Sequence, residues 1–256
     1  MGAGVATAPR WRCLAACLLL AACAPVRGPS APAPSAPSAP SASSASSFPA
    51  PAQPADPFAD LLAGRTSGTA SNPVLRIADD ALIAVTVRRG GALARLGHDH
   101  VVAARRIDGR VDPAAGLAVL RFRLDEMTVD EAALRSEAGL TTQPSADAIA
   151  GTRVNMLTKV LDAQTFPFVE VRAQRTGVAG AVQADITLHG VTRRYTVPAA
   201  LDTTPPGLTA RGTLVLKQTD FGITPFSVMG GAMAVQDALE IRFVLPARPA
   251  VPEAVR

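Results

Sequence analysis

The alternation of apolar and polar side chains sets the narrowest limit on how this chain can fold. From Val74 onward, apolar residues recur at every second position in several runs, with polar residues between them. Side chains two residues apart lie on one face of a strand, so this period indicates strands with one buried and one wet face. The runs occupy 120–124, 182–188, 195–201, 208–216 and 239–245.

Turn-forming residues separate these runs, as at 112–116, 176–177 and 205–207, which favours an antiparallel meander. Two segments break the alternation and are predicted to be helical. Val129–Gly139 is rich in helix formers and ends at a glycine, and Ser145–Leu161 begins with a candidate cap. About eight strands with one helical insertion favour a closed barrel, because closure removes exposed sheet edges. The predicted class is mainly β, an antiparallel eight-stranded barrel with a short helical insertion.

The glycine-rich stretch Gly222–Gly231 is too irregular for a strand. It is either a plain connection or an element at the rim of the barrel. Long loops in compact domains are usually functional, which favours the rim.

The N-terminal part of the chain has a different character. Arg10 and Arg12 precede a short apolar stretch, as in a secretory signal peptide, and the stretch ends in Leu20-Ala21-Ala22-Cys23. This ending resembles a bacterial lipobox, which implies acylation of Cys23; the alternative is an ordinary secretory signal and a free thiol. Ala24, rather than Asp, favours the outer membrane by enterobacterial sorting.

A Pro/Ala/Ser-rich linker follows, too poor in apolar residues to fold, although a segment around Phe58–Leu62 is a candidate for docking on the domain. The expected organisation is a signal peptide at 1–22, lipidated Cys23 and linker at 23–71, a barrel domain at 72–247 and a tail at 248–256.

Cysteine content and charge limit the function classes. Cys13, Cys17 and Cys23 all lie before the predicted domain, which therefore has no disulfide, thiolate ligand or cysteine nucleophile. Residues 1–22 carry two arginines and no acid, so their removal lowers the net charge from +4 to +2. So weak a charge gives no support to a nucleic-acid partner.

Three segments, in order, resemble the YceI-like family. They are GTRVNMLTKVLDAQTFPFVEVRA (151–173), ADITLHGVTRRYTVPAAL (184–201) and LVLKQTDFGITPFSVMGG (214–231). The resemblance implies an extended lipocalin-like barrel, secreted or periplasmic, that holds a long apolar molecule such as a polyisoprenoid, a quinone-like molecule or a fatty-acyl derivative.

The residues expected to line the lumen are mostly aliphatic. An eight-stranded barrel is just wide enough to hold one small ligand or to fill itself with side chains, and the sequence leaves both open. The candidates are Leu120, Phe122, Val169, Val171, Ile186, Tyr195, Val197, Leu214, Ile241 and Phe243.

Two of the three histidines stand together in Gly97-His98-Asp99-His100. If 96–102 is a strand, His98 and His100 share one face and can bind one metal ion. His189 could complete such a site, with Asp99, Asp220 or Asp237 as a carboxylate ligand. The alternative is a polar cluster that contacts the head group of a ligand or hydrogen-bonds to Asp220.

Four functions remain open at this stage. The first is a carrier of an apolar ligand, without catalysis and without a certain cofactor. The others are a metal-binding or redox-associated envelope protein, a purely structural lipoprotein, and a hydrolase. A hydrolase would need Ser227 within hydrogen-bond reach of His98 or His100, since nothing here resembles a nucleophile elbow.

Overall fold

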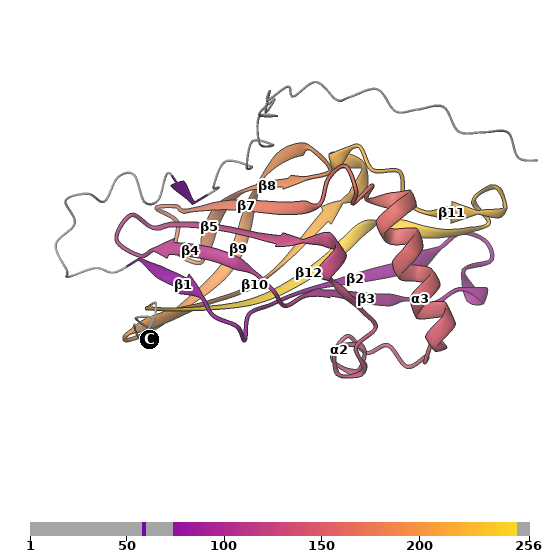
Figure 1. Ribbon diagram of the computed structural model, residues 1–256, viewed down its shortest axis with the longest axis horizontal. Helices are drawn as coiled ribbons and strands as arrows, with labels where there is room; N and C mark the ends of the chain where they lie inside the picture. The colour runs from indigo at the N-terminus through magenta and orange to yellow at the C-terminus, as the bar shows by residue number, and fades with distance from the viewer. Residues whose placement is uncertain (1–57, 60–73, 250–256) are drawn as a thin grey trace, which may run out of the picture. The chain divides into compact units, whose positions relative to one another are not determined.

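The computed structural model describes residues 58–59 and 74–249 (Figure 1), so the predicted signal peptide, Cys23 and most of the linker lie outside the described residues. The described residues all belong to one compact unit, Gln53–Arg256. Its strands are β1 (Leu75–Ile77), β2 (Leu82–Gly90), β3 (His100–Ala104), β4 (Asp108–Asp112), β5 (Leu117–Arg123), β6 (Thr128–Val129), β7 (Phe168–Arg175), β8 (Ala181–Leu188), β9 (Val191–Thr204), β10 (Gly207–Lys217), β11 (Ser227–Val228) and β12 (Met233–Pro249). Its helices are α2 (Ala132–Glu137) and α3 (Ala146–Asn155).

The strands pair into a closed ring. β1 and β2 form one bent strand, because both pair with β12 while β1 pairs with β4 and β2 with β3. β3 and β4 form a second bent strand and β5 and β6 a third, since β4 pairs with β5 and β3 with β6. From β5 the ring continues antiparallel through β7, β8, β9 and β10 to β12.

With each bent strand counted once, the ring contains eight strands: β1/β2, β3/β4, β5/β6, β7, β8, β9, β10 and β12. The predicted eight-stranded antiparallel barrel is therefore confirmed. All of these pairings lie between Leu75 and Pro249, so the ring closes within the compact unit Gln53–Arg256. The last strand extends to Pro249, slightly beyond the expected boundary at 247.

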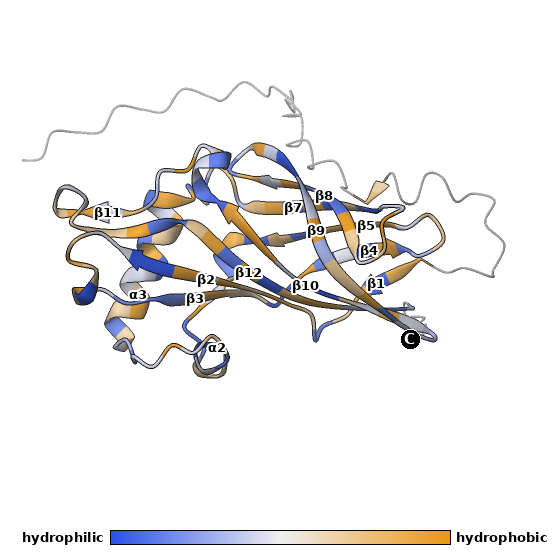
Figure 2. Cartoon of the chain, turned by 180° about the vertical axis from the view of Figure 1, so that it is seen from behind, coloured by the Kyte–Doolittle hydropathy of each residue, from blue (hydrophilic) through white to orange (hydrophobic). Residues whose placement is uncertain are grey.

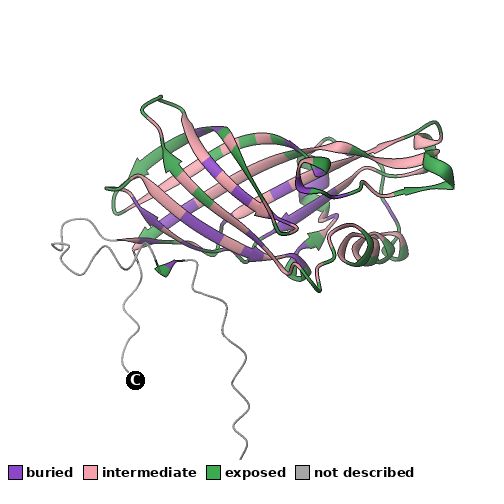
Figure 3. Ribbon diagram, turned by 90° about the horizontal axis from the view of Figure 1, so that it is seen from above, coloured by how far each residue is buried: buried purple, intermediate pink, exposed green. Residues whose placement is uncertain are grey.

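The alternation in the sequence becomes an alternation of burial. On β8, for example, Ala184, Ile186 and Leu188 are buried while the residues between them remain partly exposed. Figure 2 shows apolar and polar positions interleaved along the strands, and Figure 3 shows the matching bands of burial. The apolar sets face the interior of the barrel, where they form the main core.

The barrel has two distinct ends (Figure 1). The hairpin end carries the short turns β4–β5, β7–β8 and β9–β10, and the helix end carries α3, β11 and the β2–β3 connection.

The two predicted helices are both present. α2 is shorter than the predicted 129–139 helix because left-handed residues bound it, Asp130 with φ 58° and Gly139 with φ 67°. α3 begins where predicted, and the Ser145 hydroxyl accepts a hydrogen bond from the Ala148 N–H at 3.2 Å. A π-helical turn continues it to Val160 and packs apolar residues on the barrel core. Within the described residues, no helix has the length and apolar character needed to cross a bilayer.

The strand considered over 96–102 is present only in its second half. β3 begins only at His100, and a 3-10 turn occupies Ala94–Leu96. The chain must reverse after β2, and it does so through Gly91, whose φ of 85° favours glycine. Successive backbone hydrogen bonds then close the turns, ending with Gly97 N–H to the Ala94 carbonyl at 3.0 Å. His98 consequently lies in a connection rather than on a strand.

Phe58, in the segment named as a candidate for docking, packs on the outer wall of the barrel. Its side chain is 5% exposed and packs with Val119 and Leu117. The guanidinium carbon of Arg110 lies 5.2 Å from the centre of its ring, and that of Arg121 lies 5.7 Å away. Such contacts between cations and aromatic rings add to the burial of the ring.

Candidate functional site

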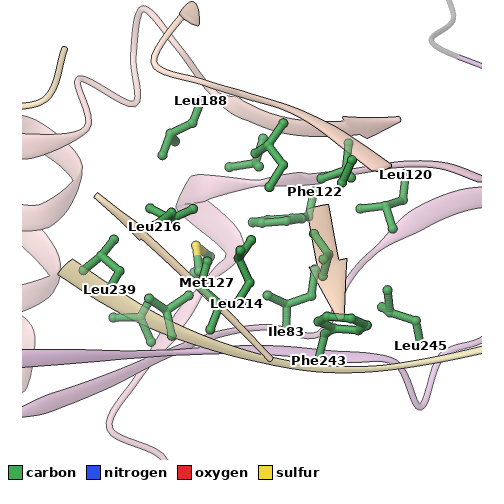
Figure 4. Close-up of a pocket in the computed structure, with 18 of the residues that line it drawn as sticks. Ile83, Leu120, Phe122, Met127, Leu188, Leu214, Leu216, Leu239, Phe243 and Leu245 are labelled. Atoms are coloured by element: carbon green, nitrogen blue, oxygen red, sulfur yellow. The ribbon is translucent and has the colours of Figure 1, made fainter. Parts of the chain in front are cut away.

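A cavity of about 1070 Å³ lies inside the barrel. Its lining reaches Pro113 and Pro206 in turns at the hairpin end, and Ala94 and Phe226 at the helix end. Figure 4 shows the aliphatic and aromatic side chains that surround it, Phe122 and Phe243 among them. The barrel is thus hollow along its length rather than filled by its own side chains, the alternative that the sequence left open.

The residues expected in the lumen do line this cavity, with one exception. The lining includes Leu120, Phe122, Val169, Val171, Ile186, Val197, Leu214, Ile241 and Phe243. All of them are on strands, and each belongs to the inward set of the alternating pattern.

Tyr195 is the exception, because it packs against the core beside Phe221 and does not line the cavity. Its ring stacks on Phe221 with a centroid distance of 6.2 Å, and Phe221 is fully buried. The Tyr195 hydroxyl donates a hydrogen bond to Asp220 Oδ2 at 3.2 Å. Burial and the neighbouring Asp220 carboxylate raise the pKa of Tyr195, so the phenol keeps the proton that it donates. Asp220 is therefore the partner of Tyr195 and not of the histidine pair.

Polar residues gather at the helix end of the cavity. His98 and His100 both line it, and their ring centroids are 6.3 Å apart. Thr152 and Asn155 of α3 lie on the same lining. The cavity therefore joins a long apolar interior to a polar group of side chains at one end.

His100 belongs to a buried hydrogen-bond network. Its Nδ1 lies 2.6 Å from Asp130 Oδ2, and Asp130 Oδ1 accepts from Arg135 Nη1 at 2.6 Å and from the Val101 N–H at 3.0 Å. The side chains of Asp130 and Arg135 are 0% and 1% exposed. Arg135 also donates to the Asp99 carbonyl at 2.8 Å and to Thr142. The network ties β3 to the segment that leads into α2.

These contacts determine which ring nitrogen of His100 donates a hydrogen bond to Asp130. Burial by itself raises the pKa of Asp130, but the hydrogen bonds from His100, the Val101 N–H and Arg135 outweigh it, and the pKa lies below its ordinary value. An ionised carboxylate only accepts hydrogen bonds, so Nδ1 of His100 must be the donor. The other nitrogen, Nε2, lies 3.4 Å from Thr152 Oγ1 and is left for polar groups at the cavity wall.

The three histidines do not form the cluster that a shared metal site needs. His189 is at a left-handed position in the β8–β9 turn, with φ 53°, and its ring lies on Phe166 with a centroid distance of 4.6 Å. Among residues 58–59 and 74–249, no three His, Cys, Asp or Glu side chains are grouped so that they could hold a metal ion. Asp237, another proposed ligand, accepts hydrogen bonds from Thr219 instead.

Sequence reasoning missed Asp130, Arg135 and Thr152. Asp130 lies thirty positions from His100, and the helical insertion folds back to bring the two together. A left-handed aspartate before a short helix gives no strong sequence signal.

The chain has measurable similarity to known proteins. The model of the YceI-like domain family matches residues 95–247, which is more than half of the chain. A polyisoprenoid binding domain from Saccharophagus degradans is 13% identical, with 70% of this chain and 100% of that chain covered at a TM-score of 0.50. Burkholderia cenocepacia BcnA is 17% identical, with 65% of this chain and 95% of that chain covered at a TM-score of 0.48. A search of curated proteins found no significant match. The structural likeness to the S. degradans domain shows a shared fold. The family match over more than half of the chain establishes that this chain belongs to the YceI-like family.

Proposed function

We propose that the protein binds a long apolar molecule, of the polyisoprenoid, quinone-like or fatty-acyl kind, in the lumen of the barrel. The observation that carries this proposal is the cavity of about 1070 Å³, lined mostly by aliphatic and aromatic side chains. Each 100 Å² of ligand surface removed from water contributes about 2.5 kcal/mol before the costs of association. A long chain buried along the lumen therefore has enough surface to bind without charged contacts.

Two further observations support the same ligand class. The polar end of the cavity, at His98 and His100, gives the head group of such a molecule a place to hydrogen-bond. The fold is also that of the S. degradans domain, which is a polyisoprenoid binding protein. Ser227, the serine considered as a nucleophile, is exposed on β11, where it lies opposite Ala234 in the strand pairing. This position favours ligand binding over catalysis.

The ligand is best identified on the Gln53–Arg256 segment, expressed in bacteria and examined by native mass spectrometry followed by organic extraction. We expect a co-purifying isoprenoid or acyl species of defined mass. Leu214 lines the lumen on β10, while the next residue, Val215, points outward and is 60% exposed. Leu214→Trp should abolish the bound mass, and Val215→Trp should retain it. A bare parent protein that also takes up no added prenol would overturn the proposal.

We further propose that the protein is exported and anchored by lipid to the bacterial envelope, on the periplasmic face of the outer membrane. The lipobox-like Leu20-Ala21-Ala22-Cys23 supports this location. Several acyl chains hold a protein stably at a bilayer, whereas one binds only marginally.

This anchoring predicts that cells given radiolabelled palmitate will label the protein. Cys23→Ala should remove the label, because the acylated sulfur is lost. Cys17→Ala, within the same leader, should leave the label unchanged. Label that survives Cys23→Ala would contradict the anchoring proposal.

A further inference from the structure

The helix end of the barrel presents an exposed apolar surface around the mouth of the cavity. We call Leu96, Phe226, Val228 and Met229 the apolar rim. Leu96, Val228 and Met229 are 59%, 40% and 68% exposed. In Figure 1, the β11 segment projects past the barrel at this end, and Figure 2 shows hydrophobic colour on it. Exposed apolar surface of this kind marks an interaction site.

The rim has a defined structure, because hydrogen bonds join the β2–β3 connection to the segment that runs from Phe226 to the start of β12. The Leu93 N–H donates to the Ala232 carbonyl at 2.7 Å, and the Val235 N–H donates to the Phe226 carbonyl at 2.9 Å. β11 pairs with the start of β12, with Val228 opposite Met233. A Cβ on Gly91 would come within 2.5 Å of the Ala232 carbonyl oxygen, so the two connections touch. Their close contact holds Leu96 and Met229 at one end of the molecule.

The composition of the rim is unusual for a surface that faces water. From Gly222 to Val235 the chain carries no charged side chain. The same stretch contributes Phe226, Val228 and Met233 to the lining of the cavity. Apolar surface is therefore continuous from the exterior of the rim into the lumen.

Positive charge flanks this apolar surface. Arg95 is exposed beside Leu96, and the Lys159 ammonium lies 5.9 Å from the centre of the Phe226 ring. Asp99, the acid in the same connection, has its carboxylate within 3.6 Å of Arg88 and 3.7 Å of Arg89. Among residues 58–59 and 74–249, neither Arg95 nor Lys159 forms an ion pair. Exposed apolar side chains next to such cations are the arrangement by which a protein surface enters the interface of an anionic bilayer.

We propose that the apolar rim docks on an anionic lipid bilayer and places the mouth of the cavity against it. A long apolar ligand is stored in bilayers, and this contact lets it pass between membrane and lumen without crossing water. The exchange step rests on the proposed carrier function. The docking step rests on the rim alone.

Docking is tested by sedimenting the Gln53–Arg256 segment with vesicles of phosphatidylcholine and phosphatidylglycerol, and with vesicles of phosphatidylcholine alone. We expect binding to the mixed vesicles that weakens at high salt. Met229→Asp and Leu96→Asp should each weaken it on the order of tenfold, because a carboxylate is costly to bring into the interface and repels anionic lipid.

Val178→Asp is the matched control, because Val178 is also 68% exposed but lies in the β7–β8 turn at the hairpin end. This variant should bind vesicles like the parent, and thermal unfolding should show that all three variants remain folded. Equal loss in Val178→Asp, or no loss in Met229→Asp, would overturn the proposal. The proposal would also be overturned if the parent protein does not bind vesicles and instead forms a dimer that Met229→Asp dissociates.

A separate measurement distinguishes docking from carriage. Leu214→Trp, with a blocked lumen, should still bind vesicles. Met229→Asp should load prenol normally from detergent solution but at least several-fold more slowly from vesicles. Equal loading rates from vesicles in the parent and Met229→Asp would contradict the role of the rim in exchange, whatever the ligand proves to be.

Discussion

Asp130 gathers three hydrogen-bond donors in a place that water does not reach. It accepts from His100, Arg135 and the Val101 backbone, and its side chain has no exposed surface. A buried pair of charges adds little net stability, but the loss of one partner leaves the other charge uncompensated. The network therefore serves mainly to hold β3 and the start of α2 in one arrangement and to orient His100.

Asp130→Asn should lower the free energy of unfolding by about 3 kcal/mol, because it leaves the Arg135 guanidinium buried without its counter-charge. Urea denaturation followed by circular dichroism measures this change. Glu131→Gln is the control, since the ion pair of Glu131 with Arg105 is partly exposed and should contribute less than about 1 kcal/mol. Equal losses in the two variants would refute the special role of Asp130.

The same carboxyl predicts a pH dependence. The folded pKa of Asp130 lies below its ordinary value of 3.8, so its ionised form stabilises the fold above that value. This contribution is lost as the pH falls through the folded pKa. The stability difference between the parent and Asp130→Asn should therefore be constant near neutral pH and shrink below about pH 4. A difference that grows on acidification would have the wrong sign for this linkage.

At this scale the sequence predicted inward-facing residues well and polar partners poorly. Leu120 and Ile241 follow from the two-residue period alone, because a strand offers only two faces. Tyr195 satisfies the same period, yet it stacks on Phe221, from a 3-10 turn, and does not line the cavity. The contacts of His100 depend on Asp130 and Thr152, which tertiary folding brings to it and no local pattern encodes.

At the scale of the elements, each bent strand of the barrel bends at the point where its partner on one side changes from one strand to another. β1 gives way to β2 through a turn at Asp79-Asp80, and β12 pairs with both. The local sequence does not indicate that the strands on either side of this turn continue one another in the barrel wall. That continuity is visible only from the pairing with β12, far along the chain.

One strand position depends on the absence of a side chain. Gly212 on β10 lies opposite Phe243 on β12, and a Cβ at Gly212 would come within 2.6 Å of that ring and into the Pro198 carbonyl. We expect Gly212→Ala to destabilise the domain by about 1–3 kcal/mol through overpacking. Thermal unfolding measures the effect. Gly177→Ala, where a Cβ meets nothing within 4 Å, should stay close to the parent, and equal losses would refute the packing argument.

At the scale of the whole molecule, Phe58 couples the segment before the barrel to its outer wall. Phe58→Ala should cost about 2 kcal/mol, from lost burial and lost contact with Arg110 and Arg121. The expected result is faster proteolysis near residue 58 and a lower unfolding midpoint. Ala59→Ser, at an exposed neighbour, should change neither. An unchanged cleavage rate in Phe58→Ala would show that the docked ring does not hold this segment.

The pairing of β1 with β12 has a consequence for how the protein is made. Leu75 on the first strand lies opposite Pro249 on the last, so the ring can close only after the last strand is present. Since a chain is synthesised from its N-terminus, β1 and β2 emerge long before β12, their shared neighbour, exists. Unpaired strand edges are sites of association between chains. Until β12 has been synthesised, the edge that β1 and β2 share with it is therefore open to pairing with another copy of the chain.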